Sequence, residues 1–158
     1  MLNQKDKKKV CDIADYICRE LLDIQPVPIK FERNEGFSTQ TTKAILCIKD
    51  NGEKTIYIDP EREFNPEIVF DIGHELRHLY QFQILGMNGV LEKPSSKCTV
   101  EEYNMQFPEL DANAFGEICM VEITGCKPLY NGFSKEVKDA INERVEFLFE
   151  HEFIREFL

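Results

Sequence analysis

Two of the three histidines in the chain lie four residues apart, in the segment His74-Glu75-Leu76-Arg77-His78. On a helix this spacing puts both imidazole rings on one face, about 6 Å apart along the axis, so that both can bind one metal ion. Zinc accepts neutral imidazole nitrogens, and a catalytic zinc site leaves one position for water. Glu75 is placed to take a proton from that water. The segment therefore predicts one Zn²⁺ ion, with Glu75 as the general base of a hydrolase.

A catalytic zinc site needs a third protein ligand, and the chain offers a carboxylate rather than a histidine. The remaining histidine, His151, lies among charged residues late in the chain, where we expect a solvent-exposed side chain. Glu109 is the preferred third ligand and Asp111 is the alternative. On a helix these two carboxylates point about 200° apart, so both are not expected to bind. Asn113, one turn beyond Glu109, is expected to accept an N–H group from a ligating histidine.

The segment that carries the two histidines is expected to form a core helix rather than a surface helix. Asn65 and Pro66 suit its N-cap and first helical position, and Gly86 suits its end. Apolar residues recur at helical spacing on one side of the segment, which predicts that this side is buried; they are Ile68, Val69, Ile72, Leu76, Leu79 and Leu85. The two ligands are therefore predicted to stand on a rigid element.

Hydrophobic periodicity and turn signals predict the elements around this helix. The pair Asn51-Gly52 between two β-prone runs predicts a hairpin with a type I′ turn. The predicted elements are a helix at 7–22, a short strand at 29–32, hairpin strands at 43–49 and 54–59, a helix at 66–85, a long loop at 88–107, a helix at 108–123 and a last helix after Ser134. Together they predict an α+β fold in one domain, residues 1–158.

The composition narrows the class of partner. Acidic residues outnumber basic residues by 29 to 19, for a formal net charge of -10, and a surface of this sign repels phosphate backbones. We therefore expect no nucleic-acid partner. No stretch approaches the roughly 20 apolar residues that cross a bilayer, and the N-terminus lacks the pattern of a secretory signal peptide. These features predict a cytoplasmic protein with no membrane partner, and they leave the oligomeric state unknown.

These motifs resemble those of gluzincin-type zinc metallopeptidases, in which H-E-x-x-H on one helix is completed by a glutamate on a following helix. The E-x-x-A-D pattern of such enzymes is similar to Glu109-Leu110-Asp111-Ala112-Asn113. The chain also resembles ImmA/IrrE-like proteins of bacteria and their mobile elements, whose hairpin, H-E-x-x-H helix and E-x-x-A-x-x-F segment are similar to residues 56–59, 68–78 and 109–115. Two residues depart from the pattern: Arg77 stands where a small residue is common, and Asn113 where an aspartate is usual.

The resemblance implies a zincin-like minimal metallopeptidase domain, with a small β-sheet or hairpin packed on the active-site helix and several further helices. It implies hydrolysis of a peptide bond in a protein or peptide substrate, which an edge strand can hold by backbone hydrogen bonds. The reaction also needs a donor for the developing oxyanion, and Tyr80, Tyr103 and Tyr130 are the candidates. The alternative function is a non-catalytic or regulatory zinc-binding module of the same fold.

Overall fold

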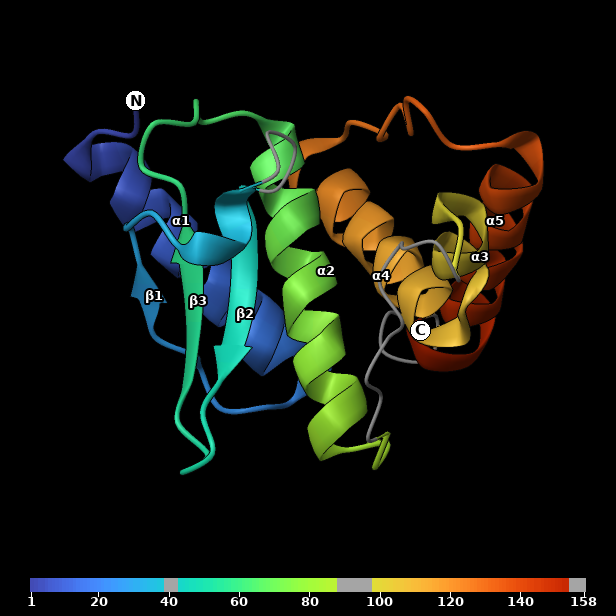
Figure 1. Cartoon of the computed structure of the whole chain (residues 1–158), viewed down its shortest axis with the longest axis horizontal. Coiled ribbons are helices and arrows are strands. Elements are labelled where there is room, and N and C mark those ends of the chain that lie inside the picture. The colour runs from blue at the N-terminus through green and yellow to red at the C-terminus, as the bar shows by residue number, and fades with distance from the viewer. Residues whose placement is uncertain (39–42, 88–97, 154–158) are drawn as a thin grey trace.

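The structure of the chain is a computed structural model that describes residues 1–38, 43–87 and 98–153. It confirms a mixed α+β fold, in which a small sheet lies to one side of a group of helices (Figure 1). None of the helices within the described ranges is both long and apolar enough to cross a lipid bilayer. The elements, in chain order, are α1 (Gln4–Tyr16), a π-helical segment (Ile17–Leu22), β1 (Ile29–Lys30), a 3₁₀ turn (Glu35–Ser38), β2 (Ala44–Ile48), β3 (Lys54–Ile58), α2 (Pro66–Gln83), α3 (Val100–Met105), α4 (Phe107–Thr124), α5 (Lys135–Leu148) and a second π-helical segment (Phe149–Phe153).

The sheet has three strands in the order β1-β3-β2, so that β2 lies at an edge. β1 runs parallel to β3, and β2 pairs antiparallel with β3 through the predicted hairpin. The prediction of a type I′ turn is wrong. The Gly52 N–H donates to the Lys49 carbonyl, and within the loop a positive φ, of 85°, is found at Gly52 but not at Asn51. A three-residue loop of this kind needs one left-handed residue rather than two.

Prolines and capping residues place the helix starts close to where the sequence predicts them. α2 and α4 begin at or beside Pro66 and Pro108, and the side chain of Ser134 caps α5. α1 begins earlier than predicted, because Asn3 and Asp6 form a reciprocal capping box at its start.

A short helix lies within the segment that the sequence predicts to be a long loop, residues 88–107. This helix is α3, and the Thr99 side chain caps it by accepting the Glu102 N–H at 3.0 Å. The first part of the predicted loop, residues 88–97, lies outside the described residues. The correction matters for function, because α3 carries one of the three candidate tyrosines.

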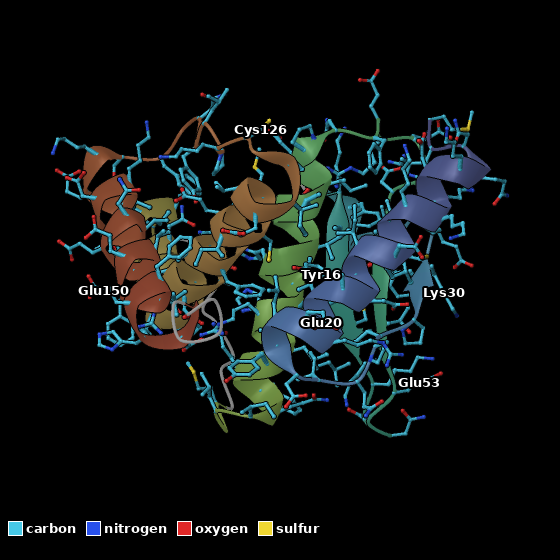
Figure 2. The ribbon with its side chains drawn as sticks, turned by 180° about the vertical axis from the view of Figure 1, so that it is seen from behind. Tyr16, Glu20, Lys30, Glu53, Cys126 and Glu150 are labelled. Atoms are coloured by element: carbon cyan, nitrogen blue, oxygen red, sulfur yellow. The ribbon has the colours of Figure 1, made fainter. Side chains whose placement is uncertain are left out.

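α2 is the central helix, between the sheet and α4 (Figure 1). Its Ile68, Ile72 and Leu76 side chains are fully buried and share one hydrophobic cluster with Ile56 and Ile58 of β3. Seen from behind, α1 crosses in front of α2 and the sheet, and its apolar stripe joins the same cluster (Figure 2). The prediction of a buried side is therefore confirmed for five of its six residues. It is wrong for Leu85, which lies beyond the end of α2 and is 45% exposed. The two histidines stand on an element anchored in the core.

Two glycines allow α2 and α4 to approach each other closely. A Cβ atom added at Gly73 would come within 2.9 Å of the Cys119 Sγ, and one added at Gly116 would come within 2.9 Å of the Phe70 carbonyl oxygen. Neither distance is compatible with ordinary van der Waals contact, and a core packed at this density has little room to adjust. Larger residues at these positions would force the two helices apart.

We predict that Gly116→Ala destabilises the protein, although alanine is normally the better helix former. The added methyl group meets a backbone carbonyl that cannot rotate away, and overpacking of this kind costs about 1–3 kcal/mol. Urea unfolding followed by circular dichroism measures the free energy of unfolding. The control is Glu122→Ala, at an exposed position of the same helix, which should change it by less than about 0.5 kcal/mol. Equal effects of the two substitutions would contradict the prediction.

Candidate metal centre

Three side chains from α2 and α4 converge on one point: His74, His78 and Glu109. The Nε2 of His74 lies 3.2 Å from Oε1 of Glu109, the Nε2 of His78 lies 3.2 Å from Oε2, and the two Nε2 atoms are 3.1 Å apart. Within residues 1–38, 43–87 and 98–153, this is the one group of three potential ligands whose atoms all lie within 4.8 Å of one another. His151 is exposed and does not join it. The structure thus brings together the two predicted histidines and the preferred carboxylate.

The donor set fits a divalent metal ion. The two imidazole nitrogens face each other at hydrogen-bonding distance, so at most one of them can carry the proton between them. The Oε2 of Glu109 is buried and accepts no hydrogen bond, although His78 lies within ion-pair distance. A buried carboxylate oxygen without a hydrogen bond is unfavourable unless another group, such as a cation, satisfies it. Two imidazoles and a carboxylate directed at one point suit a borderline metal such as zinc.

The charges of the site favour a cation. Burial opposes a positive charge on the His74 ring, but the carboxylate of Glu109 outweighs it and raises the pKa of His74 to about 9. Burial acts to raise the pKa of Glu109, and the two histidines outweigh that effect and lower it. The attraction that holds a proton on His74 acts on a divalent metal ion as well. Metal and proton therefore compete for the same ring nitrogen.

Glu75 lies beside the three ligands and not among them. Its Oε2 accepts a hydrogen bond of 3.0 Å from the backbone N–H of Leu46 in β2. Burial raises the pKa of Glu75, and the neighbouring histidines offset this only in part. A carboxylate with a raised pKa, held in one orientation next to the ligands, is suited to accept a proton and return it.

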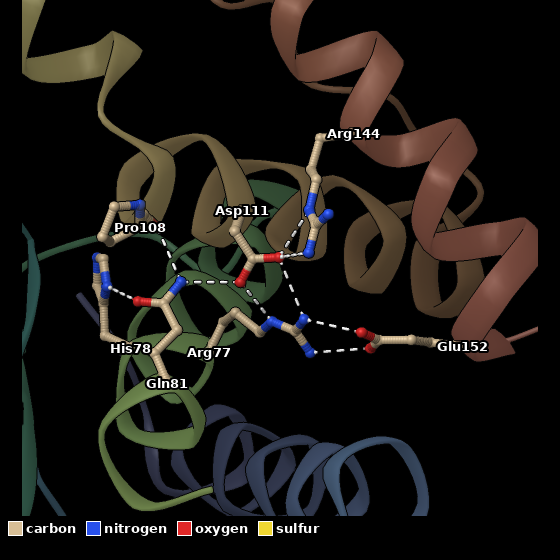
Figure 3. A network of polar contacts seen from close by, with 7 residues as sticks. All are labelled: Arg77, His78, Gln81, Pro108, Asp111, Arg144 and Glu152. Atoms are coloured by element: carbon tan, nitrogen blue, oxygen red, sulfur yellow. Dashed lines mark hydrogen bonds and ion pairs between the residues drawn. The ribbon is translucent and has the colours of Figure 1, made fainter. Parts of the chain in front are cut away.

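The ring of His78 is oriented by Gln81, which lies one turn further along α2. The Oε1 of Gln81 lies 3.0 Å from Nδ1 of His78 (Figure 3). In the tautomer that donates this bond, Nε2 carries no proton and is free to bind a metal. The Gln81 amide also donates to the Pro108 carbonyl at 2.9 Å and to Asp111 Oδ2 at 2.8 Å. Because α4 thus holds the amide, it also helps to orient His78.

Asp111 is the centre of a buried ion-pair network and does not reach the histidines. Its carboxylate is fully buried and accepts hydrogen bonds of 2.7 Å and 3.1 Å from Arg77. Arg144 of α5 donates a further bond of 3.0 Å, and Glu152 accepts from the far side of Arg77 (Figure 3). The alternative assignment of Asp111 as the third ligand is therefore not supported, because two guanidinium groups hold this carboxylate.

The expected hydrogen bond between Asn113 and a ligating histidine is not made in the structure. The Asn113 amide nitrogen and the His74 Nδ1 are both buried, and neither has a hydrogen-bond partner among the described residues. Gln81 takes the expected role, for His78 rather than for His74. Its sequence signal is its spacing, because a residue three positions after His78 lies on the same face of the helix.

One of the three candidate tyrosines, Tyr103 of α3, lies at the site. Its burial and the nearby carboxylates of Glu109 and Glu75 raise its pKa. The other two candidates lie elsewhere: the ring of Tyr80 packs on a guanidinium group of the ion-pair network, and the hydroxyl of Tyr130 donates to a backbone carbonyl of α4.

The comparisons with known proteins assign the chain to no family. No family model matches the sequence, and no curated protein or solved structure matches it. The geometry of the site is therefore the basis for a functional assignment.

We predict that Asp111→Asn lowers the free energy of unfolding by about 3–5 kcal/mol, because it leaves the charges of Arg77 and Arg144 buried without their main counter-ion. Chemical denaturation measures the change. The control is Asp139→Asn, which removes an exposed ion pair with Lys135 on α5 and should leave the stability nearly unchanged. A cost for Asp111→Asn no larger than that of the control would contradict the assignment of a buried network.

We also predict that Gln81→Leu weakens Zn²⁺ binding about 10- to 100-fold, because the ring of His78 loses the acceptor that orients it. Competition with a chromophoric chelator measures the affinity, and circular dichroism checks that the fold is kept. Gln83→Leu, two residues later at an exposed position of α2, is the matched control and should bind zinc like the wild type. Equal zinc affinity in both variants would show that Gln81 does not position the ligand.

Proposed function

We propose that the chain is a zinc-dependent metallopeptidase of the gluzincin type, similar to ImmA/IrrE-like proteins, that hydrolyses a peptide bond in a cytoplasmic protein. The observation that carries the proposal is the convergence of His74, His78 and Glu109 on one point, with Glu75 beside them. These are the ligand types of a catalytic zinc site, and they stand on two helices of a small α+β domain, as in a zincin-like fold.

The number of ligands supports catalysis over a purely structural metal site. Structural zinc sites are closed by four protein ligands, whereas catalytic sites use three and keep a position for water. As far as the structure describes the chain, three residues join the group, and neither Asp111 nor His151 supplies a fourth. This arrangement favours a hydrolase over the alternative of a non-catalytic or regulatory zinc-binding module.

Glu75 is the residue that moves the proton. When bound, zinc supplies a Lewis acid that activates a water molecule and polarises the carbonyl to be attacked. The carboxylate of Glu75 takes the proton of the attacking water and returns it to the leaving amine. Burial raises the pKa of Glu75, which helps it to keep that proton between the two steps. The N–H of Leu46 holds the carboxylate in place.

Tyr103 is the best-placed donor for the negative charge that develops on the substrate oxygen. Its hydroxyl lies next to Glu109, and its raised pKa keeps it protonated and able to donate. A donor held in place before the reaction stabilises such a charge more effectively than water does.

The edge strand β2 supports binding of an extended substrate beside the metal. The Lys49 N–H donates to the Glu53 carbonyl, and the Lys43 carbonyl accepts from the Asp59 N–H, so residues 43 and 49 direct these groups toward β3. In an antiparallel pair, successive residues direct their backbone groups alternately toward the partner strand and away from it. The backbone groups of residues 44, 46 and 48 therefore face the free edge of β2. The bond from Leu46 N–H to Glu75 agrees with this alternation. A peptide that adds to this edge gains backbone hydrogen bonds with little demand on its sequence.

We predict that Glu75→Gln keeps the metal and loses hydrolysis by a factor of at least about 10², because glutamine still accepts the Leu46 N–H but cannot take a proton. The zinc-loaded chain is incubated with a casein peptide mixture, and mass spectrometry measures the products. Elemental analysis measures bound zinc. Glu109→Ala should lose both zinc and activity, and Glu122→Gln, at an exposed position of α4, should lose neither. Undiminished hydrolysis by Glu75→Gln would refute the proposed mechanism.

A further inference from the structure

A mostly apolar pocket opens beside His78, next to the last turn of α2. It has a volume of about 160 Å³, and its apolar walls are formed by Leu46, Ile48, Phe82, Met87 and Pro108. His78 and Gln81 line it as well, so it borders directly on the candidate metal centre. Phe82 is 46% exposed and Ile48 is 38% exposed, so the mouth of the pocket presents apolar surface to solvent. Such surface next to a polar site is typical of a ligand-binding position.

The size of the pocket suits one medium-sized side chain. An apolar cavity of about 150 Å³ in another protein holds a benzene ring, so a volume of about 160 Å³ accommodates leucine, methionine or phenylalanine. Alanine would leave most of the pocket unfilled and gain little from burial.

The polar side chains that line the pocket, those of His78 and Gln81, are already hydrogen-bonded. The Nδ1 of His78 bonds to Gln81, and the amide nitrogen of Gln81 donates to both Pro108 and Asp111. A polar side chain that entered the pocket would therefore lose its water without gaining a donor from these groups, which is unfavourable. The pocket is thus selective against polar side chains, in addition to its selection by size.

The position of the pocket along β2 indicates whether it binds a substrate side chain on the N-terminal or the C-terminal side of the cleaved bond. β2 and α2 run side by side in the same direction, and the Leu46 N–H bonds to Glu75 at the metal centre (Figure 1). The pocket includes Ile48, two residues further along β2, together with the later α2 residues His78 and Phe82. Antiparallel pairing is the more stable mode of strand addition. A peptide bound in this mode has its N-terminal part towards Ile48.

We propose that this pocket binds the side chain immediately N-terminal to the cleaved bond and selects leucine, methionine or phenylalanine there. The inference rests on the proposed peptidase function and specifies its substrate class: extended peptide segments with a medium-sized apolar residue on the N-terminal side of the bond. Specificity is set mainly at this pocket, because the edge strand recognises backbone.

Binding of amino acid hydroxamates tests the pocket without requiring catalysis. The probes are the hydroxamates of N-acetyl-leucine, N-acetyl-alanine and N-acetyl-aspartate, in which the zinc-binding group replaces the carbonyl that would be attacked. The side chain then stands in the position N-terminal to the cleaved bond. Calorimetry on the zinc-loaded chain should show about 10- to 100-fold tighter binding of the leucine probe than of the alanine probe, with the aspartate probe weaker still.

Two variants make the test specific to the pocket. Ile48→Phe narrows it and should abolish the preference for leucine over alanine. Ile84→Ala, at a position 56% exposed near the same end of α2 but outside the pocket lining, is the matched control and should keep the preference. Sequencing of the cleaved bonds in a casein peptide mixture gives an independent measure of the same preference.

The outcomes separate this inference from the proposed function. Hydrolysis without an apolar preference on the N-terminal side, or with a preference on the C-terminal side, overturns the pocket assignment and leaves the peptidase function standing. A leucine preference in hydroxamate binding that Ile48→Phe removes supports the pocket even if the chain hydrolyses no peptide, and in that case the peptidase function fails alone. Equal affinity for the leucine and alanine probes overturns the inference in every case.

Discussion

The close packing of α2 against α4 is the constraint on which the rest of the structure depends. The candidate ligands come from both helices, and Glu109 reaches His74 and His78 because the two helices pack closely against each other. Gly73 and Gly116 make that approach possible, since a single methyl group at either position would meet atoms of the facing helix at 2.9 Å. The candidate metal centre is therefore a property of the helix pair and not of the H-E-x-x-H segment alone.

The buried charges of this helix pair are divided into two groups with different tasks. Asp111 is compensated by Arg77 and Arg144, and Glu152 balances the far side of Arg77, so this group fastens α4, α5 and the C-terminal π-helical segment to α2. The ligand group keeps a carboxylate and two imidazoles available for a cation. Gln81 connects the two groups and carries no charge. It can thus help to orient His78 while the ion-pair network, whose two positive and two negative charges balance, stays separate from the candidate metal centre.

The features that the sequence predicts correctly depend on residues close together in the chain. Proline and capping residues set the helix starts, and helical spacing was enough to favour Glu109 over Asp111. The missed features of the candidate site depend on contacts between distant residues. Arg77 is a departure from the pattern of the resembled families, and its reason is visible only when Asp111, 34 positions later, is seen to lie against it. The role of Gln81 is missed in the same way, since two of the three hydrogen bonds of its side chain are to α4.

The contacts that hold the three candidate ligands in place are made by protein groups: helix packing, the ion pairs of Asp111 and the amide of Gln81. In a zinc finger, by contrast, metal binding supplies the free energy of folding, so that loss of the ion unfolds the chain. Here the scaffold is held by its own side chains, so the ion of the proposed function would add to the stability of the fold rather than supply it. Under that proposal, metal supply in the cell would affect the fraction of molecules that are active more than the number that escape degradation.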